Sequence, residues 1–146
     1  MSQVSQILVA DDDPDDVLLL KEAMGEVGNV CQIRSVADGQ ELMEYLGGRE
    51  KGGEVPRPDL ILLDLNMPRK NGFEVLKELK ADPVYRRIPV VIWTTSRREE
   101  DVSKTYFLGC NSYMTKPASF EELVGKMKGL LGYWFQLVDL PRAKTA

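Results

Sequence analysis

The sequence predicts one α/β domain in which helices cover both faces of a five-stranded parallel sheet, giving three layers. Short apolar runs alternate with amphipathic segments five times, which is typical of successive βα units. Runs such as 60–63 and 90–93 are apolar at consecutive positions, so both faces of these strands are expected to be buried. The chain has 146 residues, of which 43% are apolar, enough for one normal core.

Each expected strand is a short apolar run, and each helix start has its own marker. We expect strands at 5–10, 31–36, 59–63, 89–94 and 111–115. The marker is a capping residue with an acid three positions later, a common signature of a helix N-terminus. In chain order the pairs are Asp13 with Asp16 and Pro14 between them, Asp38 with Glu41, Asn71 with Glu74, Ser96 with Glu99, and Ser119 with Glu122.

The longest gap between elements is 47–58, which holds four Gly and two Pro in twelve residues. It is expected to be a mobile insertion loop within the domain. Cys31 and Cys110 have no CxxC spacing and are expected to be buried thiols in a reducing compartment. Because no basic leader and no membrane-length apolar run is present, we expect a cytoplasmic protein without a membrane partner.

Charge and histidine content exclude several classes of function. The chain carries 19 bases and 23 acids, and five of those acids are Asp within residues 11–16. Removing these five from 23 leaves 18 acids against 19 bases, so one segment accounts for the net charge of −4. This balance argues against a nucleic-acid partner. Histidine is absent, which excludes a histidine general base, a histidine metal ligand and phosphohistidine within this chain.

Helix capping explains only part of the acidic segment. Asp13 suits an N-cap and the acids after Pro14 suit the first turn, but Asp11 and Asp12 lie where a buried strand ends. Asp64 follows another strand in the same way. Because parallel strands end at one edge of a sheet, these three carboxylates are expected to converge. Such a set of oxygen ligands suits Mg²⁺ or Mn²⁺.

Two further residues are expected at this edge. The fourth strand ends in Thr94, and Lys116 follows the fifth strand. A lysine competes with a metal for carboxylates, but it becomes useful when a phosphoryl group arrives. The residues therefore predict that Asp64 attacks phosphorus, that Asp11 and Asp12 hold the metal, and that Lys116 offsets phosphoryl charge.

Five segments in this order resemble the receiver domain of two-component response regulators. They are 7–12 (Ile-Leu-Val-Ala-Asp-Asp), 59–68 (Asp-Leu-Ile-Leu-Leu-Asp-Leu-Asn-Met-Pro) with Asn71-Gly72, Thr94, and 113–117 (Tyr-Met-Thr-Lys-Pro). The resemblance implies a flavodoxin-like (βα)5 fold with strand order 2-1-3-4-5. It also implies that Asp64 takes a phosphoryl group from a sensor histidine kinase or a His phosphotransfer protein.

The resemblance further assigns roles to individual residues. Asn66 offers its backbone carbonyl to the metal, Thr94 is the switch hydroxyl, and Tyr113 is the aromatic residue that changes rotamer. The bond between Lys116 and Pro117 is implied to be cis. The protein would then be no enzyme beyond its own phosphorylation and dephosphorylation.

The C-terminal region is expected to make contacts outside the domain. Residues 1–131 form the receiver-like domain and 132–146 an extension, with no DNA-binding output domain expected. One helical stripe is apolar at 3-4 spacing: Phe120, Leu123, Val124, Met127, Leu130, Leu131, Trp134 and Val138. Further apolar residues lie off the stripe: Tyr133, Phe135, Leu137 and Leu140. One sheet cannot bury both sets, so we expect a homodimer through this region, with folding back onto the domain as the alternative.

The long loop and the tail together are similar to stand-alone regulators that pair with bacterial phytochromes.

Three functions are alternatives to a phosphorylation switch. An Asp-nucleophile phosphatase needs a second Asp where this chain has Asn66, and an FMN carrier would place a phosphate against the five Asp. A receiver-like module that docks without phosphorylation remains the third alternative.

Overall fold

The computed structural model describes residues 4–28, 31–50 and 55–141, with the side chains of 49 and 50 left aside. Five parallel strands form one sheet in the order β2-β1-β3-β4-β5, as the resemblance implies. The strands are β1 (Ser5–Ala10), β2 (Cys31–Val36), β3 (Leu60–Leu63), β4 (Val90–Thr94) and β5 (Ser112–Thr115). The helices are α1 (Pro14–Val27), α2 (Gly39–Glu50), α3 (Gly72–Ala81), α4 (Glu99–Leu108) and α5 (Phe120–Gly132). A 3₁₀ turn, η1 (Tyr85–Arg87), precedes β4, and a π-helical turn, η2 (Tyr133–Leu137), follows α5.

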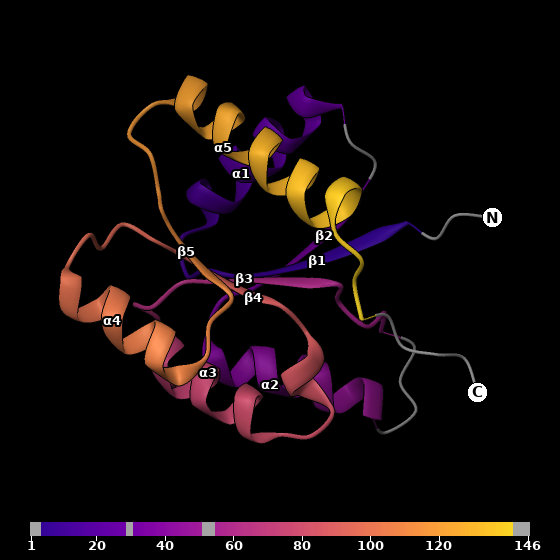
Figure 1. Cartoon of the computed structure of the whole chain (residues 1–146), viewed down its shortest axis with the longest axis vertical. Helices are drawn as coiled ribbons and strands as arrows, with labels where there is room; N and C mark the ends of the chain where they lie inside the picture. The colour runs from indigo at the N-terminus through magenta and orange to yellow at the C-terminus, as the bar shows by residue number, and fades with distance from the viewer. Residues whose placement is uncertain (1–3, 29–30, 51–54, 142–146) are drawn as a thin grey trace.

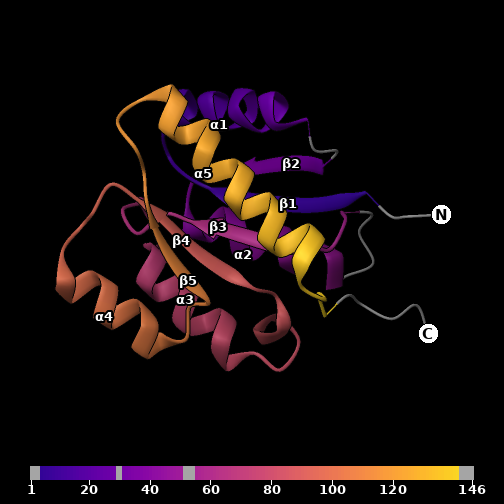
Figure 2. The ribbon, with the colours of Figure 1, turned by 45° about the horizontal axis from the view of Figure 1, so that its top comes forward.

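The sheet is the middle of three layers. Helices α1 and α5 cover one face, and α2, α3 and α4 cover the other (Figures 1 and 2). The side chains of successive residues in the central strands pack into the cores on opposite faces of the sheet, because side chains alternate along a strand. Leu60 and Leu62 face the α1/α5 side, whereas Ile61 and Leu63 face the opposite side. This double burial explains why these runs are continuously apolar and confirms the expectation from the sequence.

The register brings the ends of the central strands together. Ala10 of β1 is paired with Leu63 of β3, so the residues that follow them, Asp11 and Asp64, are neighbours. Thr94 of β4 is paired with Thr115 of β5, directly before Lys116. The parallel topology therefore collects residues from four distant parts of the chain at one edge.

Four of the five expected helix starts are confirmed, and one is wrong. Asp13, Asn71 and Ser119 are the N-caps of α1, α3 and α5, and the Asp38 carboxylate accepts from the Glu41 N–H at the start of α2. At α4 the N-cap is Arg98 rather than Ser96.

The hydroxyl of Ser96 explains this difference. It donates to the Asp101 carboxylate at 2.5 Å and accepts from the Arg98 N–H at 3.3 Å. The serine therefore stabilises the first turn of α4 from outside the helix and leaves α4 to begin two residues later than a direct cap predicts.

The expected loop at 47–58 is shorter in the structure. Helix α2 continues to Glu50, so Gly47 and Gly48 are helical and this part of the expectation is wrong. Residues 51–54 lie outside the described residues, and 55–58 run without regular structure into β3. The Tyr45 hydroxyl donates to the Pro56 carbonyl at 3.0 Å, which ties the returning chain to α2.

The apolar stripe of α5 is largely confirmed. Leu123, Met127, Leu130 and Leu131 are buried against the sheet and α1. At the ends of the stripe, Phe120 is 41% exposed, whereas Trp134 packs partly against the core. Cys31 and Cys110 are free thiols, of which Cys110 is buried and Cys31 half-buried. Among the described helices, none has the length and apolar character that crossing a membrane requires.

Candidate functional site

Three carboxylates meet at the carboxyl edge of the sheet. Asp11, Asp12 and Asp64 each have an oxygen within 4.8 Å of the others, as the sequence predicts. Asp11 is 4% exposed and Asp64 is 6% exposed, whereas Asp12 faces solvent. An arrangement of two buried carboxylates and one exposed carboxylate can hold a hard divalent cation that retains water on its open side.

Backbone hydrogen bonds hold the two buried carboxylates in place. The Asp11 N–H donates to the Val36 carbonyl, and the Asp64 N–H donates to the Ala10 carbonyl, each at 3.0 Å. On the side chains, Asp11 Oδ1 accepts from the Asp13 N–H at 3.0 Å and Asp64 Oδ1 accepts from the Asn66 N–H at 3.2 Å. In both residues the Oδ1 atom is thereby oriented by the following turn.

Lys116 is the cation of this cluster. Its Nζ lies 2.7 Å from Asp11 Oδ2, 3.0 Å from Asp64 Oδ2 and 3.1 Å from Asp16 Oδ2, and its side chain is 9% exposed. Burial by itself would lower the pKa of Lys116. The hydrogen bond to Asp11 and the charges of Asp64 and Asp11 outweigh burial, so the pKa is raised and the side chain stays an ammonium.

The Asp11 carboxyl shows the opposite balance. Burial raises its pKa above the ordinary value of 3.8, although the hydrogen bonds from Lys116 and the Asp13 N–H act in the other direction. The nearby Asp64 charge adds to the increase. A bound divalent cation would counteract this increase in the pKa, because it stabilises the charged form of both carboxylates.

Thr94 lies at the end of β4, is completely buried, and accepts from the Ser96 N–H at 3.4 Å through Oγ1. Tyr113 is half-buried on β5, and its hydroxyl donates to the Ser96 carbonyl at 2.9 Å. Burial raises the pKa of Tyr113, so the phenol remains protonated near neutral pH. Ser96 of the β4–α4 loop is therefore hydrogen-bonded to the hydroxyls of both Thr94 and Tyr113.

The loop after Asp64 is held close to the site by two contacts. The Arg69 guanidinium lies 2.9 Å from Asp38 Oδ2, and the Gly39 N–H donates to the Lys70 carbonyl at 3.1 Å. Arg69 itself has a left-handed φ of 64°, which is uncommon for a residue other than glycine. Asn66, whose backbone carbonyl the resemblance assigns to the metal, lies on this loop and is exposed.

One expectation about the backbone is wrong. No peptide bond of the described residues is cis, so the bond between Lys116 and Pro117 is trans. The Lys116 N–H donates to the Thr94 carbonyl at 2.7 Å, which continues the ladder between β4 and β5 and orients the lysine toward the carboxylates.

A family model decides where this fold and site belong. The model of the response regulator receiver domain matches residues 7–128, most of the chain. The chain is a response regulator receiver domain. The matched part contains all five segments of the resemblance, from the acidic pair after β1 to the lysine after β5.

Two response regulators are similar along almost the whole chain. Response regulator Rcp1 of Synechocystis is 39% identical over 137 residues, which are 94% of this chain and 93% of Rcp1. The crystal structure of the phosphorylated cyanobacterial phytochrome response regulator RcpA is 39% identical, with a TM-score of 0.89 over 96% of this chain and 100% of that one. The Mn²⁺-bound form of Rcp1 is 37% identical, with a TM-score of 0.84 over 94% and 99%.

Sequence reasoning missed one residue of this receiver's site. Asp16 was interpreted only as a first-turn acid paired with the Asp13 cap, yet its carboxylate contacts Lys116. Helical spacing could have indicated its direction, because Asp16 and the buried Leu20 are four residues apart and lie on the same side of α1. That spacing places Asp16 toward the sheet, but it does not name Lys116 as the partner.

Proposed function

We propose that this receiver is a phosphorylation switch in which Asp64 accepts a phosphoryl group from a sensor histidine kinase or a His phosphotransfer protein. The observation that carries the proposal is that Asp64 lies in contact with both kinds of charge. Its buried carboxylate is grouped with those of Asp11 and Asp12 and also pairs with the Lys116 ammonium. A nucleophile, a site for a metal and a fixed cation are the parts that phosphoryl transfer to a carboxylate requires.

The proposed reaction forms one bond to phosphorus and breaks another. A carboxylate oxygen of Asp64 forms a bond to phosphorus while the phosphorus–nitrogen bond of the donor phosphohistidine breaks. The electron pair of that bond goes to the imidazole nitrogen, which takes its proton from solvent. The product on this chain is an acyl phosphate, and no histidine of the chain is needed, in agreement with its composition.

Asp11 and Asp12 are the residues that would hold Mg²⁺ or Mn²⁺, together with Asp64 and the backbone carbonyl of Asn66. When bound, the cation offsets the negative charge on the phosphoryl oxygens. The close grouping of three carboxylates supports this assignment, as does the Mn²⁺-bound form of the relative Rcp1. Lys116 supplies a second positive charge next to Asp64.

Thr94 and Tyr113 are proposed to transmit the change. The Thr94 hydroxyl would turn from the Ser96 N–H to a phosphoryl oxygen and draw the β4–α4 loop inward. Because Tyr113 donates to the Ser96 carbonyl, movement of this loop breaks or remakes that hydrogen bond and releases the ring to another rotamer. The surface of α4, β5 and α5 then changes its affinity for a partner.

A phytochrome is proposed as the sensor kinase, working with this receiver in the cytoplasm. The similarity to the phytochrome response regulator RcpA over 96% of this chain supports this pairing.

Acetyl phosphate provides the direct test of phosphoryl uptake. With Mg²⁺ we expect the protein to gain the mass of one phosphoryl group, and we expect chelation of the metal to prevent the gain. Hydroxylamine should remove the group, because it cleaves acyl phosphates but not serine or threonine phosphates. No gain in mass, or a group that resists hydroxylamine, would contradict the proposal.

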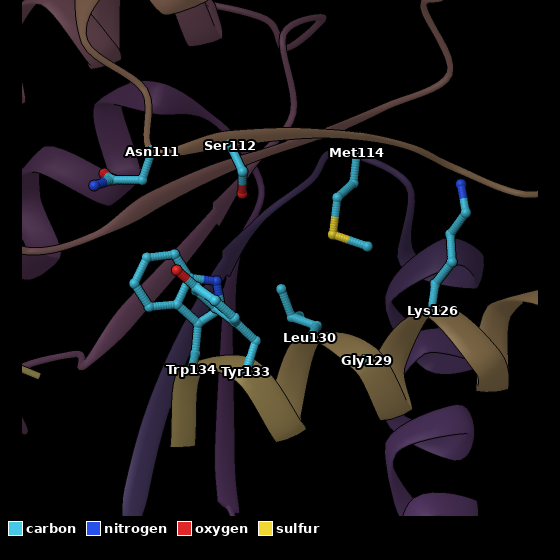
Figure 3. A pocket seen from close by; sticks show the side chains of 8 residues that line it. All are labelled: Asn111, Ser112, Met114, Lys126, Gly129, Leu130, Tyr133 and Trp134. Atoms are coloured by element: carbon cyan, nitrogen blue, oxygen red, sulfur yellow. The ribbon is translucent and has the colours of Figure 1, made fainter. Parts of the chain in front are cut away.

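We further propose that residues 1–131 form the receiver proper and that 132–146 act in homodimer formation. Tyr133 is 50% exposed and Leu137 is 78% exposed, although both follow directly on the core helix. Tyr133 also lines an open groove of ≈ 610 Å³ between β5 and the end of α5. Figure 3 shows Met114, Leu130 and the ring of Trp134 around this groove. A second copy of the same surface would cover these apolar side chains.

Light scattering tests the dimer. Deletion of residues 133–146 would also remove Trp134 and Phe135, which pack against the core, so substitution is the cleaner change. We expect the wild-type protein to be a dimer at micromolar concentration and the double variant Tyr133→Glu/Leu137→Glu to be a monomer. Val84→Glu is the matched control, since Val84 is also exposed but precedes η1. A monomeric wild type would refute the proposal.

A further inference from the structure

Asp16 is a fourth carboxylate at the site and is not part of the group that can hold a metal. The cluster with metal-ligand spacing contains Asp11, Asp12 and Asp64. The Asp16 carboxylate instead pairs with the lysine, with its Oδ2 atom 3.1 Å from Lys116 Nζ, and its side chain is 37% exposed. The two residues are 100 positions apart and belong to α1 and to the turn between β5 and α5.

The ammonium group of Lys116 has three N–H donors, and each of them has a carboxylate partner. The partners are Asp11 at 2.7 Å, Asp64 at 3.0 Å and Asp16 at 3.1 Å. Two of these partners change when the proposed reaction proceeds. Asp11 would share its charge with a bound cation, and Asp64 would become an acyl phosphate whose charge lies on the phosphoryl oxygens. Asp16 is the partner of Lys116 that neither step alters.

We infer that Asp16 is a positioning residue that keeps the Lys116 ammonium directed at the phosphoryl group throughout the reaction. This inference rests on the proposed function and adds a residue to it. Lys116 follows a strand at the edge of the sheet, and its long side chain has many rotamers. Its contact with Asp16 fixes the ammonium against α1, which packs beside α5 (Figure 2). The lysine then needs no reorganisation when the phosphoryl oxygens arrive.

Helix α1 offers a matched control in the neighbouring residue. Asp15 also lies in the first turn, carries the same charge and interacts with the same helix dipole, and its N–H donates to the same Asp13 cap. Asp15 is exposed, and no ion pair joins it to Lys116 among the described residues. A comparison of Asp16→Asn with Asp15→Asn therefore separates the lysine contact from the general effect of one negative charge at the helix start.

The first arm of the test measures the rate of phosphorylation by acetyl phosphate with saturating Mg²⁺. We expect Asp16→Asn to lower the rate about fivefold, the effect of a partly exposed ion pair, and Asp15→Asn to leave it nearly unchanged. The same substitution is then made in the Lys116→Ala protein. If Asp16 acts through the lysine, it should have no further effect there, whereas a structural or long-range role would persist.

The second arm needs no phosphorylation. Nitrogen-15 NMR of the metal-free protein measures how fast the Lys116 ammonium exchanges its protons with water. Exchange should be slow in the wild-type protein and in Asp15→Asn, and clearly faster in Asp16→Asn. Equal rates of exchange and of phosphorylation in the two variants would overturn the inference. A wild-type protein that takes up no phosphoryl group would instead refute the proposed function, while the NMR arm would still test the contact.

Discussion

Asp64→Asn is expected to abolish the gain of phosphoryl mass completely. The amide has no negative oxygen to attack phosphorus, so the nucleophile is lost while the size and shape of the side chain are kept. Lys116 still has Asp11 and Asp16 as partners, and the Asn side chain can still accept from the Asn66 N–H. The fold should therefore survive a change that removes the reaction. Mass spectrometry after incubation with acetyl phosphate and Mg²⁺ measures the loss.

The control for this variant is another Asp of the acidic segment. Asp15→Asn should gain the phosphoryl mass as the wild type does, because Asp15 is exposed and outside the metal cluster. Circular dichroism of both variants checks that the sheet and helices are intact. An undiminished gain of mass in Asp64→Asn would place the phosphoryl group on a different residue and remove the basis of the proposed switch.

Gly72→Ala is expected to destabilise the protein strongly, because an added methyl group would collide with the backbone at the end of β3. A Cβ at this position would lie 2.2 Å from the Asp64 carbonyl oxygen and 2.8 Å from Leu65 Cα. Both are backbone atoms that cannot rotate away, so α3 or the end of β3 must move. We expect the free energy of unfolding to fall by about 3 kcal/mol or more, since overpacking of this kind strains the backbone. Urea unfolding followed by circular dichroism measures the change.

The same substitution affects the site as well as the fold, because the carbonyl that it displaces belongs to Asp64. Phosphorylation of Gly72→Ala should therefore be slow even at temperatures where the protein is folded. Gly125→Ala is the control: it lies within α5 with open space around it, and it should be neutral or stabilise the protein by roughly 0.5–1 kcal/mol. Similar unfolding midpoints for the two variants would show that the backbone absorbs the methyl group at Gly72 without strain.

Local patterns were sufficient to predict most of the elements. The continuous apolar runs identify β3 and β4, since a strand covered on both faces has no polar side. The caps at Asp13, Asn71 and Ser119 depend only on residues within one turn. The failures are also local in origin. Before α4 the Ser96 hydroxyl bonds to Asp101 instead of capping the helix, and α2 continues through two glycines that sequence patterns assign to a loop.

The convergence of Asp11, Asp12, Asp64, Thr94 and Lys116 also followed from the sequence, because one topological rule applies to all parallel strands. The carboxyl ends of adjacent parallel strands lie at one edge whatever the side chains are, so residues at the ends of adjacent strands are expected to lie close together. The contact between Asp16 and Lys116 has no such rule behind it. It depends on how α1 packs beside α5 and on the rotamers of two side chains 100 residues apart. Periodicity and capping report on one turn or one strand at a time, so a contact of this kind is decided only when the tertiary structure forms.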